Sequence, residues 1–128
     1  MSVEIKYDQS RKVLDVDISG IPSLEELSSA LENIINSGDY PPNVKVIWDI
    51  RKADISSADY QFIDNLANIR SRFIKRNNGR SVLIASNDLQ YGIGRMLQML
   101  SENKFTSQFM IFRDYKEGVK WLLGKNVN

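Results

Sequence analysis

Polar and apolar residues alternate along the first twenty positions of the chain. Val3, Ile5 and Tyr7 are separated by charged residues, and after the turn-like stretch DQSRK the segment VLDVDISG alternates again. A period of two is typical of strands that bury one face. The pattern therefore predicts an N-terminal β-hairpin.

Four later segments have apolar residues at helical spacing, and each begins near a residue that can cap a helix. In the first, Ser23 and Glu26 form an S-x-x-E capping box, and Gly38 followed by prolines ends the helix. In the second, the apolar stripe consists of Phe62, Ile63, Leu66, Ile69, Phe73 and Ile74. The other expected caps are Ser56 or Ser57 for the second helix, Asn87 with Gln90 for the third and Asp114 with Glu117 for the fourth.

Three short, mostly apolar runs separate these helices: VKVIWDI, SVLIAS and QFMIF. Such runs suit inner strands that are covered on both faces. The expected order is therefore ββαβαβαβα. Because strands that alternate with helices pair in parallel through crossovers, we predict an α/β fold with four helices and a five-stranded mixed sheet, antiparallel in the hairpin and parallel afterwards. With no repeat or linker visible, residues 1–128 are interpreted as one domain.

The composition excludes several kinds of chemistry. Since the chain has no histidine and no cysteine, it offers no imidazole base, no thiolate nucleophile and no ordinary zinc site. Its 17 basic residues nearly balance its 16 acidic ones, which leaves no global field to attract nucleic acid. We expect no enzymatic activity, no cofactor and no metal. The charged N-terminus is unlike a signal peptide and no apolar run approaches the roughly 20 residues of a membrane span, so a cytoplasmic protein is expected.

Two glycines, Gly92 and Gly94, lie in the third predicted helix within the stretch SNDLQYGIGRML. A dinucleotide-binding fingerprint needs its glycines in the strand-to-helix turn and a third glycine three residues later, but position 97 is leucine. A glycine inside a helix costs about 1 kcal/mol relative to alanine, so we expect close packing against a neighbouring element to compensate. The alternative is contact with a ligand or partner, for which the candidate residues are Tyr91, Gly92, Gly94, Arg95 and Met99.

Charged clusters have ordinary structural explanations. Basic residues gather near the end of the second helix, where the helix dipole favours cations. We interpret them as a solvated helix end, with an anionic partner as the alternative; they are Arg70, Arg72, Lys75, Arg76 and Arg80. The acidic residues near strand ends lack the spacing of known metal sites or catalytic carboxylate pairs and are interpreted as turns and caps; they are Asp15, Asp17, Asp49 and Asp54.

The stretch VKVIWDIRKADISSADYQFIDNL combines a strand ending in Asp-Ile, a short connection and serines at the expected start of a helix. It resembles the STAS domain of anti-sigma-factor antagonists, in which this unit carries a phosphorylatable serine. The stretches GIGRMLQML and FRDYKEGVKWLL are similar to the third helix and the ending of the related SpoIIAA-like branch. The likeness spans nearly the whole chain, and it implies a β-α superhelix like that of STAS and CRAL-TRIO domains.

The resemblance also implies a site. In STAS antagonists a partner kinase binds around the serine, which here corresponds to the loop 51–57 and the start of the second helix. The implied partner-binding residues are Arg51, Asp54, Ser56, Ser57 and Asp59, with Ser56 and Ser57 as candidate phosphoacceptors. In this chain Ile55 separates Asp54 from Ser56, and Ala58 replaces the usual glycine. Helix capping is therefore the alternative role for both serines.

Two functional hypotheses follow. The first is a non-enzymatic, regulatory STAS-like interaction module that binds a protein partner through the loop 51–57. The second is a carrier of a lipid or other apolar small molecule, which requires a cavity of a few hundred cubic ångströms. The sequence leaves a homodimer open and does not identify the partner or the ligand.

Overall fold

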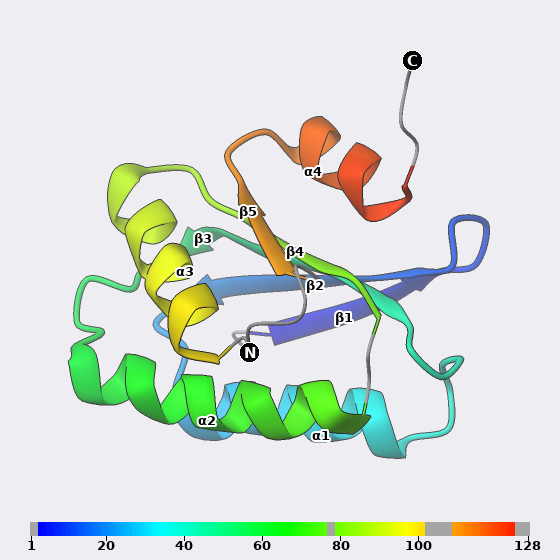
Figure 1. Ribbon diagram of the computed structural model, residues 1–128, viewed down its shortest axis with the longest axis horizontal. Helices are drawn as coiled ribbons and strands as arrows, with labels where there is room; N and C mark the ends of the chain where they lie inside the picture. Colours follow the sequence, from blue (N-terminus) through cyan, green and yellow to red (C-terminus); the bar gives the residue numbers. More distant parts are fainter. Residues whose placement is uncertain (1–2, 77–78, 102–108, 125–128) are drawn as a thin grey trace.

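The fold is a single five-stranded sheet with helices on both faces (Figure 1). The computed structural model describes residues 3–76, 79–101 and 109–124. In chain order, the elements are β1 (Val3–Asp8), β2 (Val13–Gly20), α1 (Leu24–Asn36), β3 (Lys45–Ala53), α2 (Tyr60–Arg76), β4 (Ser81–Ile84), α3 (Asp88–Ser101), β5 (Phe109–Phe112) and α4 (Tyr115–Leu122). The predicted order ββαβαβαβα is confirmed.

The strands lie in the sheet in their chain order, β1-β2-β3-β4-β5. β1 pairs antiparallel with β2, and each later pair is parallel. Consequently the carboxyl ends of β2 to β5 lie at one edge of the sheet, and the connections that lead into α1, α2 and α3 gather there. This is the mixed α/β sheet that the sequence predicts.

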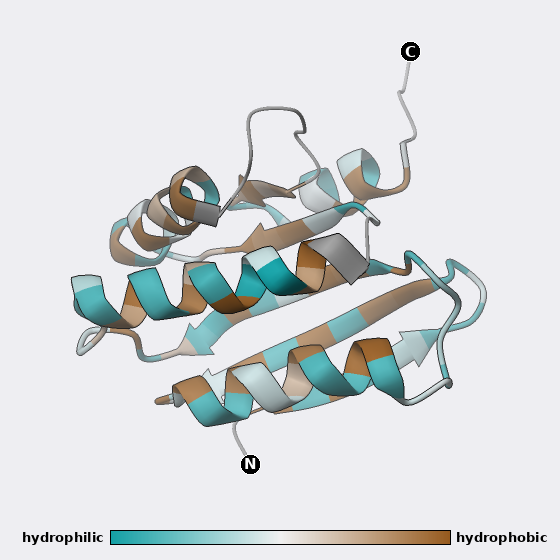
Figure 2. Cartoon of the chain, turned by 60° about the horizontal axis from the view of Figure 1, so that its bottom comes forward, coloured by the Kyte–Doolittle hydropathy of each residue, from teal (hydrophilic) through white to brown (hydrophobic). Residues whose placement is uncertain are grey.

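Helices α1, α2 and α3 cover one face of the sheet, and α4 covers part of the other (Figure 1). Successive side chains of a strand point to opposite faces of the sheet, so the hydrophobic core is divided into two clusters, one on each face. Leu14, Val16 and Val46 pack in the cluster that includes residues of α1, α2 and α3. Val13 and Ile47 join the smaller cluster beneath α4. On α1 and α2, hydrophobic and hydrophilic positions form separate stripes (Figure 2).

Several predicted helix boundaries are confirmed by their hydrogen bonds. Ser23 and Glu26 make both bonds of the capping box of α1, and Gly38 follows the helix with a positive φ of 76°. Asn87 Oδ1 accepts from the backbone N–H of Gln90 at 2.9 Å at the start of α3. Asp114 caps α4 through the N–H of Lys116. α2 ends at Arg76, and residues 77–78, which follow it, lie outside the described residues.

The connection between β3 and α2 differs from the prediction in two ways. β3 continues through Arg51 and Lys52 to Ala53, because a bulge shifts the register so that Ser19 and Gly20 pair with Lys52 and Ala53. The second helix begins at Tyr60, after Ser56 and Ser57. Both expectations were wrong because extra pairing with β2 lengthens the strand, which a local hydrophobic pattern does not reveal.

Candidate functional site

Arg51 belongs to the face of the sheet that α4 covers. Its guanidinium donates to both carboxylate oxygens of Asp49, with Nε 2.9 Å from Oδ1 and Nη2 2.7 Å from Oδ2. It also lies over the Tyr115 ring of α4, 5.3 Å from the centroid. The first of the predicted partner-binding residues is thus held in the strand by an ion pair and a ring contact.

The Asp49–Arg51 pair has opposing electrostatic influences. Burial raises the pKa of Asp49, but the hydrogen bonds from Arg51 outweigh it, so the pKa lies below its ordinary value. The same bonds raise the pKa of Arg51. The pair is therefore charged over the physiological pH range. A group that transfers protons needs a pKa near the working pH, and neither member of this pair has one. We therefore interpret the pair as structural.

The loop that follows β3 is held by hydrogen bonds to Asp54, and the second helix has not yet begun there. Asp54 Oδ1 accepts from the backbone N–H of Ser56 at 3.0 Å and from its hydroxyl at 2.7 Å. These bonds lower the pKa of Asp54. Ser56 and Ser57 are both exposed. The expectation that one of them caps α2 is wrong, because Asp59 does so: its Oδ1 accepts from the N–H of Phe62 at 2.9 Å.

The candidate residues of the third helix divide between two environments. A Cβ added at Gly94 would lie 3.0 Å from Ile111 Cγ1 and 3.3 Å from Leu83 Cδ2, so this glycine allows α3 to approach the sheet. At Gly92 an added Cβ would meet nothing within 4 Å. The predicted close packing is therefore confirmed for Gly94 and wrong for Gly92. Of the remaining candidates, Arg95 and Met99 are exposed, and Tyr91 is half-buried with the Arg113 guanidinium over its ring.

The aspartates singled out in the sequence have polar partners. Asp15 Oδ2 accepts from the Tyr115 hydroxyl at 2.8 Å, and Asp17 lies 3.5 Å from the Lys52 ammonium. Partial burial raises the pKa of Tyr115. Within the part of the chain that the structure describes, no group of three or more acidic residues could hold a metal ion.

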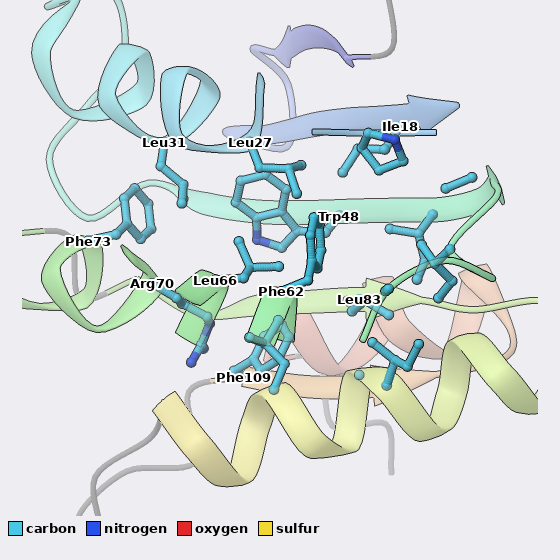
Figure 3. A pocket seen from close by; sticks show the side chains of 18 residues that line it. Ile18, Leu27, Leu31, Trp48, Phe62, Leu66, Arg70, Phe73, Leu83 and Phe109 are labelled. Atoms are coloured by element: carbon cyan, nitrogen blue, oxygen red, sulfur yellow. The ribbon is translucent and has the colours of Figure 1, made fainter. Parts of the chain in front are cut away.

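An apolar cavity of about 100 Å³ lies between the sheet and helices α1, α2 and α3 (Figure 3). Its lining comprises Ile18, Pro22, Leu27, Leu31, Trp48, Ile50, Ala53, Ile55, Ala58, Phe62, Leu66, Arg70, Phe73, Leu83, Ile93, Gly94, Leu97 and Phe109. All but one of these residues are apolar. Among the predicted site residues, only Gly94 belongs to it.

The architecture of β3 explains much of this lining. Val46, Trp48 and Ile50 alternate toward the helices, and the bulge then returns Ala53 to the same face. Trp48 stays half-buried although it lies in the central strand of the sheet, and Phe62 and Leu66 of α2 above it are also half-buried. Packing in this layer is therefore incomplete around the indole ring.

Arg70 is the one charged residue of the cavity lining. It lies on α2, its side chain is only 8% exposed, and its guanidinium carbon lies 3.9 Å from the centroid of the Phe109 ring. The interpretation of the basic cluster as a solvated helix end is therefore wrong for this residue. Arg80 is also engaged, because it donates to the carbonyl oxygen of Trp121 at 2.7 Å and stacks on the indole. Arg72 is exposed, while the side chains of Lys75 and Arg76 lie outside the described residues.

Sequence reasoning missed the cavity, although two signals point toward it. Arg70 lies four positions after Leu66 and three before Phe73, so helical spacing places it within the apolar stripe of α2. Trp48 interrupts a run of smaller apolar residues in the strand VKVIWDI. Neither signal reveals empty space, because a cavity depends on how several elements pack together.

Comparison with solved structures identifies the fold. An uncharacterized protein of the DUF3478 family from Shewanella loihica PV-4, described as having a SpoIIAA-like fold, superposes with a TM-score of 0.58. The match covers 94% of this chain and 91% of the other, at 20% sequence identity. The chain has a SpoIIAA-like fold.

This SpoIIAA-like fold agrees with the resemblance seen in the sequence. At this level of identity the comparison establishes the architecture and leaves the ligand or partner undetermined. No protein-family model matches the chain, and no curated protein matches it. Among the described residues, no helix is both long enough and apolar enough to cross a membrane.

Proposed function

We propose that this SpoIIAA-like module binds a small apolar molecule between its sheet and helices α1 to α3, as a carrier or sensor rather than as an enzyme. The observation that carries this proposal is the cavity beneath α2, which is lined by 18 residues of which 17 are apolar. Binding sites for small molecules are typically concave and mainly apolar, with few polar groups. The lining of this cavity has that character.

Energetics support occupancy of the cavity. An unfilled apolar space costs roughly 24 cal/mol per Å³, so a space of this size lowers the folding stability by about 2 kcal/mol. A molecule that fills it recovers part of that cost through dispersion contacts. The volume is smaller than the few hundred cubic ångströms expected for a carrier that encloses a whole lipid. The proposal is therefore limited to a small molecule, or to the apolar end of a larger one.

The entrance is proposed at the β3–α2 connection. Ile55 and Ala58 of this connection line the cavity and are half-buried, as is Phe62 in the first turn of α2, whereas Leu31 of α1 and Phe73 near the end of α2 are buried. A short, exposed connection moves at less cost than a helix packed on the sheet. Ligand entry would therefore pass the same loop that the sequence singles out for partner binding.

Trp48 provides a direct test because its indole lines the cavity. In a Trp121→Phe variant, Trp48 is the remaining tryptophan. We expect titration with 1-hexanol or toluene to change its fluorescence saturably and to raise the melting temperature, since a ligand of the native state stabilises it. The matched Trp48→Phe variant reports from Trp121, on the α4 side of the sheet, and its fluorescence should not respond.

A negative result would be equally clear. If neither probe produces saturation up to its solubility limit, and native mass spectrometry of protein from its own host shows no bound small molecule, the cavity is a packing defect. The same spectra report the number of subunits and thereby decide whether the homodimer that the sequence leaves open is formed.

The second candidate function is the binding of a protein partner at the loop 51–57, as the resemblance to STAS domains implies. The observation that favours it is a group of exposed apolar side chains at the carboxyl edge of the sheet. Ile21 after β2, Tyr60 at the start of α2 and Leu89 at the start of α3 are 65%, 61% and 51% exposed. Two other exposed apolar residues, Met99 and Leu100, lie in the last turn of α3, so this edge holds three of the five found among the described residues. Exposed apolar groups that gather in one place are typical of interaction surfaces.

Site-specific photocrosslinking tests this candidate. A photoreactive phenylalanine analogue at Tyr60 should capture one defined protein in cells of the host, whereas the same analogue at exposed Lys120, in the last turn of α4, should not. Equal labelling from both positions would count against a partner site at the loop. Phosphate on Ser56 or Ser57 remains a prediction, which intact-mass measurement of the captured complex would detect.

A further inference from the structure

We infer that the chain forms a homodimer in which β1 pairs antiparallel with β1 of a second copy, so that two five-stranded sheets join into one. This inference is independent of the proposed binding function. It is carried by a strand at the edge of the sheet whose charged residues complement each other when the strand meets a copy of itself.

β1 lies at one edge of the sheet and pairs on its inner side with β2 (Figure 1). The outer side of an edge strand presents backbone N–H and C=O groups that another chain can pair with, and proteins often prevent this with a proline, a bulge or a very short strand. β1 has six residues without a proline, and its register with β2 is unbroken. The opposite edge, β5, has four residues. β1 is therefore the longer surface for adding a strand.

The apolar side chains of β1 are incompletely covered. Val3, Ile5 and Tyr7 pack against the core cluster beneath α1 to α3, but each is only half-buried. Tyr40, in the connection after α1, is also half-buried, and its ring centroid lies 5.7 Å from that of Tyr7. A second β1 at this edge would bring the same side chains against them and remove further apolar surface from water.

The charged side chains favour a second copy as the partner and specify the register. Glu4 and Lys6 alternate with the apolar residues, so they point to the other face of the sheet, where they are exposed. A twofold axis through Ile5 places Glu4 directly opposite Lys6 of the second copy, twice in each dimer. Opposite charges in this position stabilise a strand pair and like charges destabilise it. A lysine alone would discourage pairing at an edge, but the nearby glutamate makes this strand complementary to itself.

The same twofold axis, perpendicular to the sheet, brings the first helices together. α1 contacts both β1 and α2, so it is the helix of this face nearest the edge. In the joined sheet, α1 of each copy lies on the same face and next to the other. This helix contact is needed because pairing of two six-residue strands buries less than the roughly 1,200 Å² of a stable interface.

Exchange of charges on β1 tests the pairing in the full chain. Sedimentation equilibrium of the parent protein should show a monomer–dimer equilibrium. Glu4→Lys leaves two lysines on the strand and Lys6→Glu leaves two glutamates, so each variant should raise the dissociation constant of the dimer by at least about tenfold. An equimolar mixture of the two variants should restore the dimer, because each lysine then faces a glutamate. Lys120→Glu, an equal change of charge on exposed α4, should leave dimerisation unaltered.

Three results would overturn the inference: a parent protein that stays monomeric up to millimolar concentration, a dimer that survives Glu4→Lys, or two folded variants that do not associate when mixed. Lys6 lies opposite Asp15 of β2, so Lys6→Glu also adds a repulsion within the subunit. If circular dichroism shows that this variant is unfolded, the parent protein and Glu4→Lys, which faces Asp17, decide the question. The ligand titrations with Trp48 test the proposed function separately.

Discussion

Two glycines of α3 lie two positions apart and have opposite surroundings. Two positions rotate a residue by about 200° around a helix, so one glycine faces the sheet when the other faces solvent. Gly94 is buried against Ile111 and Leu83, whereas Gly92 is exposed with open space where a Cβ would lie. The backbone entropy cost of a helical glycine is thus offset by packing at Gly94 alone.

We therefore expect Gly92→Ala to raise the free energy of unfolding by up to about 1 kcal/mol, the difference in helix propensity between the two residues. Gly94→Ala gains the same propensity but forces Ile111 and Leu83 to move, so it should be neutral or destabilising. Urea denaturation monitored by circular dichroism measures both. A loss of stability in Gly92→Ala would show that this position has a contact that the present structure does not contain.

Asp49 and Arg51 make a pH-dependent contribution to stability. Since the pKa of Asp49 in the folded protein lies below its ordinary value, the stabilisation is present above the unfolded-state pKa of about 3.9. It is lost as the pH falls through the lower folded-state value.

Removing the guanidinium should leave burial to dominate and raise the pKa of Asp49. We expect Arg51→Ala to cost about 1 kcal/mol at pH 7, a value reduced for the screening of a partly exposed pair. The difference from the parent protein should shrink as the pH falls and Asp49 becomes protonated. Lys52→Ala, which removes the longer contact of 3.5 Å with Asp17, should have less effect. Denaturation between pH 3 and pH 7 tests this, and a pH-independent difference would contradict it.

At the scale of elements, α2 connects the loop and the cavity. Its first turn is capped by Asp59, its inner face contributes Phe62, Leu66, Arg70 and Phe73 to the cavity lining, and its length of 17 residues spans the sheet. Its position relative to the sheet therefore determines both the width of the cavity and the path of the loop. A substitution at the start of this helix would therefore affect both the loop 51–57 and the cavity.

The cap of α2 can be tested with neighbouring residues. Asp59→Ala removes the acceptor for the Phe62 N–H and should lower the free energy of unfolding by about 1 kcal/mol. Ser57→Ala serves as the control and should change it by less than about 0.5 kcal/mol, because Ser57 is exposed and precedes the cap. Thermal and urea denaturation of the two variants are sufficient. A larger loss of stability in Ser57→Ala than in Asp59→Ala would show that Ser57 caps the helix.

At the scale of the whole molecule, the cavity results from an unequal distribution of helices. Three helices share one face of the sheet, and they meet over the central strand β3, where Trp48 lies. The space remains because none of the three supplies a side chain that fills the volume around the indole. Its apolar walls and the loop at its proposed entrance make it the feature most suited to binding.

A side chain that fills this space should stabilise the fold and prevent ligand binding. Ala58→Leu adds apolar volume at the proposed entrance, so it should raise the free energy of unfolding by up to about 1 kcal/mol and abolish the Trp48 response to 1-hexanol. Ala67→Leu adds the same atoms at a buried position of α2 outside the cavity lining and should destabilise by about 1 to 3 kcal/mol. Unaltered binding in Ala58→Leu would place the entrance elsewhere.

The sequence by itself determined the elements and most of their ends. The hairpin, the order ββαβαβαβα and the caps at Ser23, Asn87 and Asp114 follow from alternation, helical periodicity and side-chain hydrogen bonding within a few residues. These are local interactions, and the residues that make them are close along the chain. Motifs spread over most of the chain also indicated the SpoIIAA-like architecture.

Only the tertiary structure decided where β3 ends, which residue caps α2 and where space remains inside. The bulge depends on pairing between β2 and β3, and that pairing moved the start of α2 from the serines to Tyr60. The cavity depends on Trp48, Phe62, Arg70 and Phe109, which come from three elements and meet only after folding. A hydrophobic pattern specifies which side of an element faces inward, but the volume enclosed is set by the relative positions of all the elements around it.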